Sequence, residues 1–166
     1  MNFMSDSNHT IEVSLILNDQ KITATIPARE NLADFIRHRV GLMGTNVGCE
    51  QGICGACTIR MNGDMVRSCL TLTAQAQGKT LETIEGVTAS GEISDLQNAF
   101  YRNNAAQCGY CTPAMLITAA ELLEKNANPD RDDIREFLSG NICRCTGYHA
   151  IIDAIEEVAK ERNNGQ

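Results

Sequence analysis

Apolar and polar residues alternate along the first part of the chain with the period of a β-strand. Residues 11–17 place four aliphatic side chains on one face, and residues 22–26 repeat the alternation after the polar turn Asn18-Asp19-Gln20. Successive side chains of a strand point to opposite faces of a sheet. The pattern therefore predicts a β-hairpin with one buried face.

Helical spacing then replaces the alternation for one short segment. Asn31, with Asp34 three residues later, is typical of a helix N-terminus, and Gly41 is typical of a helix end. A glycine-rich loop from Gly41 to Gly55 follows.

The strand pattern returns after this loop. Residues 58–61 and 65–70 are predicted to form a second hairpin around an Asn62-Gly63 type I′ turn, with Cys69 on the return strand. A short strand is expected near residues 81–84. Two hairpins, one helix and a final strand predict a β-grasp domain of the ferredoxin type.

The second half changes from a period of 2 to a period of 3.6. The small and polar residues from Gly86 to Gly91 are expected to be a linker. Four helices are predicted after it, which gives two domains, residues 1–86 and 87–166. Their signals are a capping box at Ser94 and Gln97, an N-cap at Thr112 before Pro113, a start at Asp130 with a stop at Gly140, and apolar positions at Ile151, Ile155 and Val158.

Composition and charge exclude several classes of function. The chain has 43% hydrophobic and only 4% aromatic residues, so each core must be built mainly from aliphatic side chains. The net charge is −7 and no two Lys or Arg residues are adjacent, which argues against binding the phosphate backbone of nucleic acids. No apolar stretch is long enough to span a bilayer. The first eight residues lack the features of a signal peptide, so a cytoplasmic location is expected.

Cysteine supplies the candidate chemistry. The first set reads Cys49-x4-Cys54-x2-Cys57-x11-Cys69, which is the plant-type ferredoxin spacing for one [2Fe–2S] cluster. Glycines between these cysteines would allow a tight loop that points backbone N–H groups at sulfur. Structural zinc and disulfides are the alternatives, whereas a Rieske centre would need two histidines close to the cysteines.

The second set is Cys108-x2-Cys111 followed by Cys143-x-Cys145. Each pair lies between two predicted helices, so both loops can meet at one end or flank of a bundle. On spacing alone this set is also compatible with a four-cysteine zinc site. Two four-thiolate sites predict an electron carrier. A free-standing two-cluster ferredoxin-type shuttle and a zinc-stabilised interaction module are the alternatives.

Three motifs together resemble one family. They are GCEQGICGAC at residues 48–57, QCGYCTP at 107–113 and GNICRCTGY at 140–148. In order and spacing they resemble the small iron–sulfur subunits of the xanthine oxidase family of molybdenum hydroxylases, over roughly residues 11–159. The departures, Ile142 where Leu is usual and Ala114 where Gly is commoner, touch no cysteine.

The resemblance implies an α+β fold, with an N-terminal β-grasp plant-type ferredoxin domain followed by an all-α four-helix [2Fe–2S] domain. It also implies an electron-transfer subunit that is not catalytic on its own. Its partners would be a large molybdopterin-binding subunit and a medium FAD-binding subunit, in a heterotrimer or its dimer. Electrons would pass from the molybdopterin centre through the two clusters to FAD.

The resemblance also implies roles for individual residues. The first [2Fe–2S] cluster would be held by Cys49, Cys54, Cys57 and Cys69, and the second by Cys108, Cys111, Cys143 and Cys145. Gln107 and the Cys145 side would face the molybdopterin of the partner subunit. The amide of Gln107 suits a pterin edge, because it offers both a hydrogen-bond donor and an acceptor.

Overall fold

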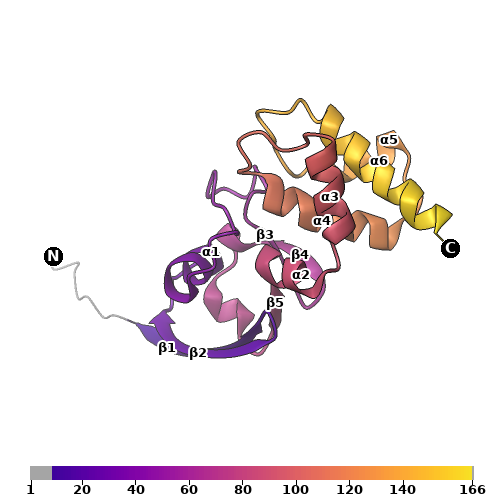
Figure 1. Cartoon of the computed structure of the whole chain (residues 1–166). Coiled ribbons are helices and arrows are strands. Elements are labelled where there is room, and N and C mark those ends of the chain that lie inside the picture. The colour runs from indigo at the N-terminus through magenta and orange to yellow at the C-terminus, as the bar shows by residue number, and fades with distance from the viewer. Residues whose placement is uncertain (1–8, 166) are drawn as a thin grey trace.

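The computed structural model describes residues 9–165, so the predicted absence of a signal peptide in the first eight residues lies outside the described part. A five-stranded sheet comes first in the chain and a group of helices second, and the two halves lie side by side (Figure 1). The predicted α+β fold class is confirmed. No helix within residues 9–165 is long and apolar enough to cross a membrane.

The sheet is built from the two predicted hairpins and one further strand. Its order is β2-β1-β5-β3-β4, and only the β1–β5 pair is parallel. Positive φ angles at Asn18, Asp19, Asn62 and Gly63 allow both hairpin turns. The strands are β1 (Thr10–Leu17), β2 (Gln20–Pro27), β3 (Thr58–Met61), β4 (Asp64–Arg67) and β5 (Thr80–Glu82).

One helical segment packs on the sheet. It begins as α1 (Leu32–Asp34), where Asn31 Oδ1 accepts a hydrogen bond of 2.9 Å from the Asp34 N–H as predicted. It continues as the π-helix η1 (Phe35–Val40) and ends at Gly41, whose φ is +87°. The wider π-helical turn was not predicted. This segment and the sheet enclose the first core.

The predicted return strand through Cys69 is too long. Strand β4 ends at Arg67, and Cys69 lies in the 3₁₀ turn η2 (Ser68–Leu70). The Ser68 hydroxyl donates a hydrogen bond of 2.7 Å to the carbonyl of Cys57, and the Ser68 backbone N–H donates one of 3.2 Å to the same oxygen. These bonds curl the chain back toward the glycine-rich loop. A second 3₁₀ turn, η3 (Thr73–Ala76), leads on to β5.

The described part of the helical half, up to residue 165, contains five helices, because the predicted linker is itself largely helical. Helix α2 buries Val87 in the helical core and ends at Gly91, whose φ is +80°. The four predicted helices follow it. The bounds are α2 (Ile84–Ser90), α3 (Ser94–Arg102), α4 (Thr112–Lys125), α5 (Arg131–Leu138) and α6 (His149–Asn164).

Only one of the three predicted N-caps of these helices is correct. Asp130 caps α5 and shares a capping box with Asp133. Helix α3 is preceded by Ile93, and the Gln97 side chain donates to Thr88 on α2 instead. Helix α4 is preceded by Cys111. At α4 the prediction fails because Cys111 already has helical dihedral angles.

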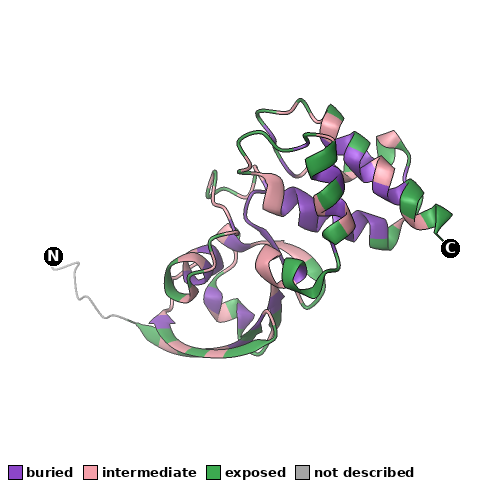
Figure 2. Ribbon diagram, in the orientation of Figure 1, coloured by how far each residue is buried: buried purple, intermediate pink, exposed green. Residues whose placement is uncertain are grey.

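A buried ion cluster joins the two halves. Arg60 on β3 is only 7% exposed as a side chain, and it faces α4. Its guanidinium lies 2.7 Å from Glu124 and 3.0 Å from Glu92, with Glu82 and Glu121 at 3.6 and 3.9 Å. Burial raises the pKa of Glu124, against the opposing charge of Arg60. Figure 2 shows the buried residues of the helical half concentrated on the facing sides of its helices.

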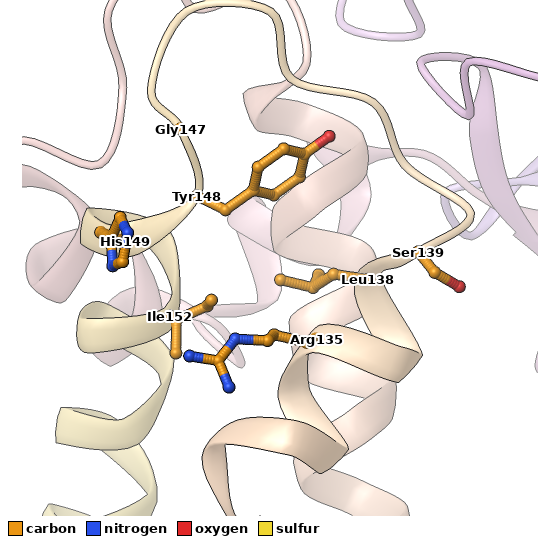
Figure 3. Close-up of a pocket in the computed structure, with 7 residues that line it drawn as sticks. All are labelled: Arg135, Leu138, Ser139, Gly147, Tyr148, His149 and Ile152. Carbon is orange, nitrogen blue, oxygen red and sulfur yellow. The ribbon is translucent and has the colours of Figure 1, made fainter.

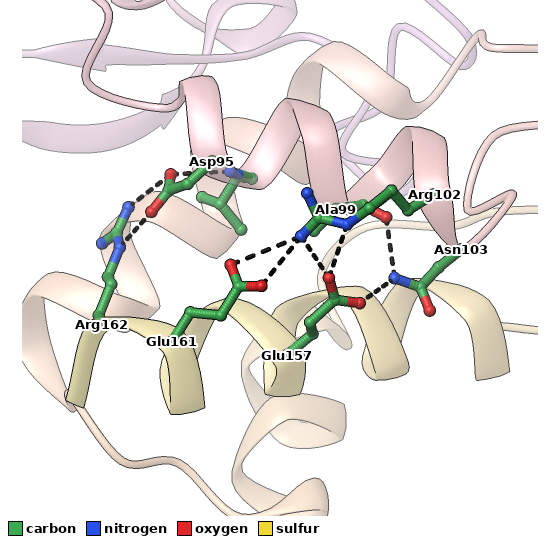
Figure 4. Close-up of polar contacts among 8 residues, drawn as sticks. Asp95, Ala99, Arg102, Asn103, Glu157, Glu161 and Arg162 are labelled. Atoms are coloured by element: carbon green, nitrogen blue, oxygen red, sulfur yellow. Dashed lines mark hydrogen bonds and ion pairs between the residues drawn. The ribbon is translucent and has the colours of Figure 1, made fainter. Parts of the chain in front are cut away.

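A second polar network ties α3 to α6 (Figure 4). Arg162 donates to the carboxylate of Asp95 at 2.7 and 3.0 Å, and Arg102 bonds to Glu157. Partial burial opposes ionisation of Asp95, but the Arg162 hydrogen bonds outweigh it and hold the pKa of that carboxyl below its usual value. Hydrogen bonds from Asn103 and Arg102 likewise lower the pKa of Glu157. The helix that follows the second cysteine set is thereby fixed against α3.

Candidate metal centres

The first four predicted ligands come together. Three lie on the loop before β3, and Cys69 reaches it from η2. The thiols of Cys49 and Cys54, and those of Cys57 and Cys69, lie close enough for each to shift the pKa of the other, and Cys49 also interacts electrostatically with Cys69. All eight cysteines of the chain are free thiols.

Glycines let this loop close on its neighbours. Gly52 and Gly55 both have φ of +73°. A Cβ atom on Gly52 would lie 2.3 Å from the Leu70 side chain, and one on Gly55 would lie 2.3 Å from the carbonyl oxygen of Gly140. A side chain at Gly52 would therefore displace the exposed Leu70 side chain, whereas one at Gly55 would meet backbone and separate the loop from the second cysteine set.

Backbone N–H groups favour a thiolate at one position of the first set. The amides of Gln51 and Cys54 each lie 3.4 Å from the Cys49 sulfur. Hydrogen bonds from Cys54 and then Gln51 lower the pKa of Cys49 to about 7, whereas burial raises the pKa of Cys69 to about 11. Four adjacent thiolates repel one another, so a bound cation is needed to ionise the whole set.

The second four predicted ligands also come together, from two loops separated by α4 and α5. Cys108 and Cys111 precede α4, and Cys143 and Cys145 precede α6. The Cys145 thiol donates to the Cys108 sulfur at 3.4 Å, and Cys111 pairs with Cys143. The set thus repeats the arrangement of two pairs.

The two pairs of the second set differ in environment. Cys108 and Cys145 are exposed, whereas Cys143 is buried. Burial raises the pKa of Cys111 to about 12. Burial also opposes ionisation of Cys143, but hydrogen bonds from Thr146, whose hydroxyl lies 3.1 Å from the sulfur, outweigh it and lower the pKa of Cys143.

The donor sets fit a dinuclear cluster. Within residues 9–165 no three His, Cys, Asp or Glu side chains converge as ligands of one metal ion. A [2Fe–2S] cluster instead spreads four thiolates over two iron atoms. Two sulfur pairs with backbone donors nearby match that requirement.

The two ligand loops touch each other directly. The Ile142 N–H donates a hydrogen bond of 2.8 Å to the carbonyl of Cys54. The buried Asn141 side chain donates to the carbonyl of Gly55 at 3.4 Å. On the other flank, the Tyr110 hydroxyl donates to the carbonyl of Val47 at 2.8 Å. Sequence reasoning identified none of these contacts.

Three further residues around the sites were missed or assigned no role. Arg67 donates a hydrogen bond of 2.7 Å to the carbonyl of Gly140. The Tyr148 hydroxyl accepts one of 2.9 Å from the Cys143 N–H. The spacing of Arg67 and Asn141, each two residues before a cysteine, was the available signal. Gln107, the predicted pterin-facing residue, is exposed beside Cys108.

A cavity of about 350 Å³ lies between the end of α5 and the start of α6 (Figure 3). Leu138, Tyr148 and Ile152 form apolar walls, with Arg135 and His149 at the rim. None of the eight cysteines lines it. The cavity is therefore separate from both candidate centres.

Comparisons with known proteins match each of the two cysteine sets to a family model. A family model described as a 2Fe-2S iron-sulfur cluster binding domain matches residues 15–83, and one described as a [2Fe-2S] binding domain matches residues 83–156. The chain is 46% identical to the nicotine 6-hydroxylase small subunit of Paenarthrobacter nicotinovorans, over 93% of each chain. It is 46% identical to the caffeine dehydrogenase subunit gamma of Pseudomonas sp. (strain CBB1), over 92% of each.

A solved structure shows the same likeness. The structure of quinoline 2-oxidoreductase from Pseudomonas putida 86 contains a chain that superposes with a TM-score of 0.84 at 46% sequence identity. The match covers 94% of the present chain and 98% of the other.

Proposed function

We propose an electron-transfer function for this chain, which belongs to the small iron–sulfur subunits of the xanthine oxidase family of molybdenum hydroxylases. It would carry electrons from a molybdopterin centre through two [2Fe–2S] clusters to FAD on a partner subunit. Such a cluster, when bound, accepts and releases one electron at a time. The two electrons that a substrate gives up would therefore pass singly. The chain itself binds no substrate in this proposal.

We assign the eight cysteines as the cluster ligands. Cys49, Cys54, Cys57 and Cys69 would hold the first cluster, and Cys108, Cys111, Cys143 and Cys145 the second. The thiol pairing supports two ligands for each iron: Cys49 with Cys54 and Cys57 with Cys69 in the first site, Cys108 with Cys145 and Cys111 with Cys143 in the second.

The observation that carries the proposal is the contact between the ligand loops. A short route leads from Cys143 through the Ile142 peptide to the hydrogen bond with the Cys54 carbonyl. It consists of backbone atoms and one 2.8 Å hydrogen bond between residues that are proposed to belong to different clusters. Two sites in direct contact suit electron exchange within one chain.

Exposure supports a proposed orientation of the chain. Cys108 and Cys145 are exposed, as is Gln107 beside them. We propose that this edge faces the molybdopterin of the large subunit, where the Gln107 amide would hydrogen-bond the pterin. The first site would then deliver electrons to the FAD-binding subunit.

The assembly and substrate are also proposed. The large and medium subunits would form a heterotrimer, or a dimer of that heterotrimer, with the present chain. Residues 1–86 and 87–166 would be the two domains of the present chain. The similar proteins are named for nicotine, caffeine and quinoline. Since all three compounds contain nitrogen heterocycles, we propose that the complex oxidises a compound of that class. A cytoplasmic location remains a prediction.

Purification of the native protein tests the proposal. We expect the chain to elute with two larger partners, and dithionite reduction to give two distinct [2Fe–2S] signals in electron paramagnetic resonance that integrate to about two spins per chain. A small free species with both signals would favour the two-cluster shuttle. A colourless, zinc-containing protein would contradict both cluster assignments.

A further inference from the structure

Arg67 lies between the two cysteine sets and bonds to both sides. It ends β4, two residues before Cys69. Its guanidinium donates to the hydroxyl of Thr58, the residue that follows Cys57, and to the carbonyl of Gly140 at 2.7 Å. A weaker contact of 3.5 Å reaches Asn141 Oδ1. One side chain thus connects the first ligand loop to the segment that leads into Cys143.

The charge of Arg67 has no carboxylate partner within residues 9–165. Its hydrogen-bond acceptors are a hydroxyl, a carbonyl and an amide oxygen. Most other arginines are neutralised by ion pairs: Arg39, Arg60, Arg102, Arg131, Arg135 and Arg162. A half-buried guanidinium without a counter-ion is costly unless an anion lies nearby.

The proposed cluster sites are candidate anions on both sides of Arg67, because Thr58 follows Cys57 and Gly140 leads into Cys143. Four thiolates around two irons leave each oxidised site with a net negative charge, and reduction adds one more. A fixed positive charge favours the more negative state, so it raises the reduction potential of a site next to it. Arg67 adjoins both sites through Thr58 and Gly140.

We infer that Arg67 is a positioning residue shared by the two clusters: it fixes the ligand loops against each other, and its charge raises the reduction potentials of both. This inference rests on the proposed function, because it takes the two cysteine sets as cluster ligands. It adds a residue that belongs to neither ligand set.

The test is a redox titration of the purified complex, followed by electron paramagnetic resonance of the two signals. In Arg67→Gln we expect both midpoint potentials to fall. At a fixed solution potential the reduced-to-oxidised ratio of each site should drop about tenfold, which is about 59 mV for a one-electron couple. Arg67→Lys keeps the charge and should leave both potentials closer to the wild-type values. A purely structural role would change cluster content and not the potentials.

Arg37→Gln is the matched control. Arg37 also bonds to neutral oxygens, the carbonyls of Met43 and Thr45 at 2.8 Å each, but these belong only to the loop before the first site. It should leave the potential of the second site unchanged. Unchanged potentials in an Arg67→Gln complex that retains both clusters, or a shift of one signal alone, would overturn the inference.

A second variant keeps the test decisive if Arg67→Gln fails to assemble. Arg67→Met keeps the apolar stem of the side chain and removes the charge, so both potentials should again fall. If they do not, the inference is wrong. Failure of the proposed function looks different, because the wild-type complex itself would then lack two [2Fe–2S] signals.

Discussion

The two cysteine sets are assembled in different ways although both form two thiol pairs. Three members of the first set lie within the nine residues from Cys49 to Cys57, and a short hairpin returns the fourth. The second set joins two loops whose cysteines are separated by 31 residues, and this interval contains α4 and α5. The first site therefore depends mainly on local turns, whereas the second depends on a packed helical core. Local spacing is informative for the first kind of site and ambiguous for the second.

Substitution of one cysteine in each set should have the largest effect and tests whether the two sites are independent. Cys54→Ser should abolish or strongly perturb the first signal and leave the second, because its carbonyl still accepts the Ile142 N–H. Cys111→Ser should abolish the second signal and also lower the melting temperature of the helical half, since the proposed cluster would join two distant loops there. Spin integration and circular dichroism of the purified complexes measure both effects. Equal loss of both signals in either variant would contradict two independent sites.

The junction between the halves gives the next largest effect. Arg60→Gln removes the buried cation and leaves four carboxylates facing one another. Breaking a buried pair costs ~3–5 kcal/mol, but three of these carboxylates are about half exposed, so we expect a loss of ~1–3 kcal/mol in unfolding free energy. Denaturant unfolding should then separate into two transitions. Arg102→Gln, at an exposed network, serves as control and should leave the unfolding free energy nearly unchanged, because exposed ion pairs contribute little.

Substitution of Gln107 tests the proposed orientation of the second site without changing either cysteine set. Gln107→Ala should leave both clusters assembled, because no cysteine changes. It should slow reduction by substrate, since the pterin would lose a hydrogen bond worth ~0.5–1.5 kcal/mol. Stopped-flow reduction by substrate, set against reduction by dithionite, separates this step from later ones. Equal slowing with both reductants would show that this edge does not face the molybdenum centre.

The pH dependence of stability should have opposite signs at the two polar networks. The folded pKa of Asp95 lies below its ordinary value of 3.8, so its stabilising effect is present above that pH and is lost only as pH falls through the folded pKa. The folded pKa of Glu124 lies above 4.5, so its effect is present at low pH and is lost as pH rises through the folded pKa.

Two variants measure this difference by thermal unfolding at pH 7 and pH 5. Asp95→Asn should lower stability by ~0.2–1 kcal/mol at both values, because the ion pair with Arg162 is lost. In the wild type, the raised pKa of Glu124 contributes stability as the pH falls from 7 to 5. Glu124→Gln should remove this contribution. A Glu124→Gln variant with the wild-type pH dependence would show that this carboxyl does not carry the effect.

Much of the fold could be predicted, because the hairpins and helices follow periodic patterns. The errors occur where tertiary contacts override a local signal. Cys69 leaves the strand because Ser68 bonds to the Cys57 carbonyl. The expected linker at residues 86–91 is largely helical because Val87 finds a place in the helical core.

The cysteines themselves could be recognised as candidate ligands, but their surroundings could not. Arg67 belongs to a predicted strand, but strand alternation says nothing of its bond to Gly140, and Asn141 likewise bonds to Gly55 on the other half of the chain. Pairing of the thiols likewise depends on how two loops meet in space. Spacing alone left zinc open at the second site, and the arrangement in two pairs is what favours a dinuclear cluster.

The contact between Cys54 and Ile142 has a consequence for how this subunit can diverge. The hydrogen bond uses only main-chain atoms, so most amino acids at position 142 can donate it equally well. The Ile142 side chain is 47% exposed and free to adapt to a different neighbour. Proline is the exception, because it lacks the N–H. This one hydrogen bond is thus insensitive to nearly every substitution at position 142, while the surface around it can be remodelled.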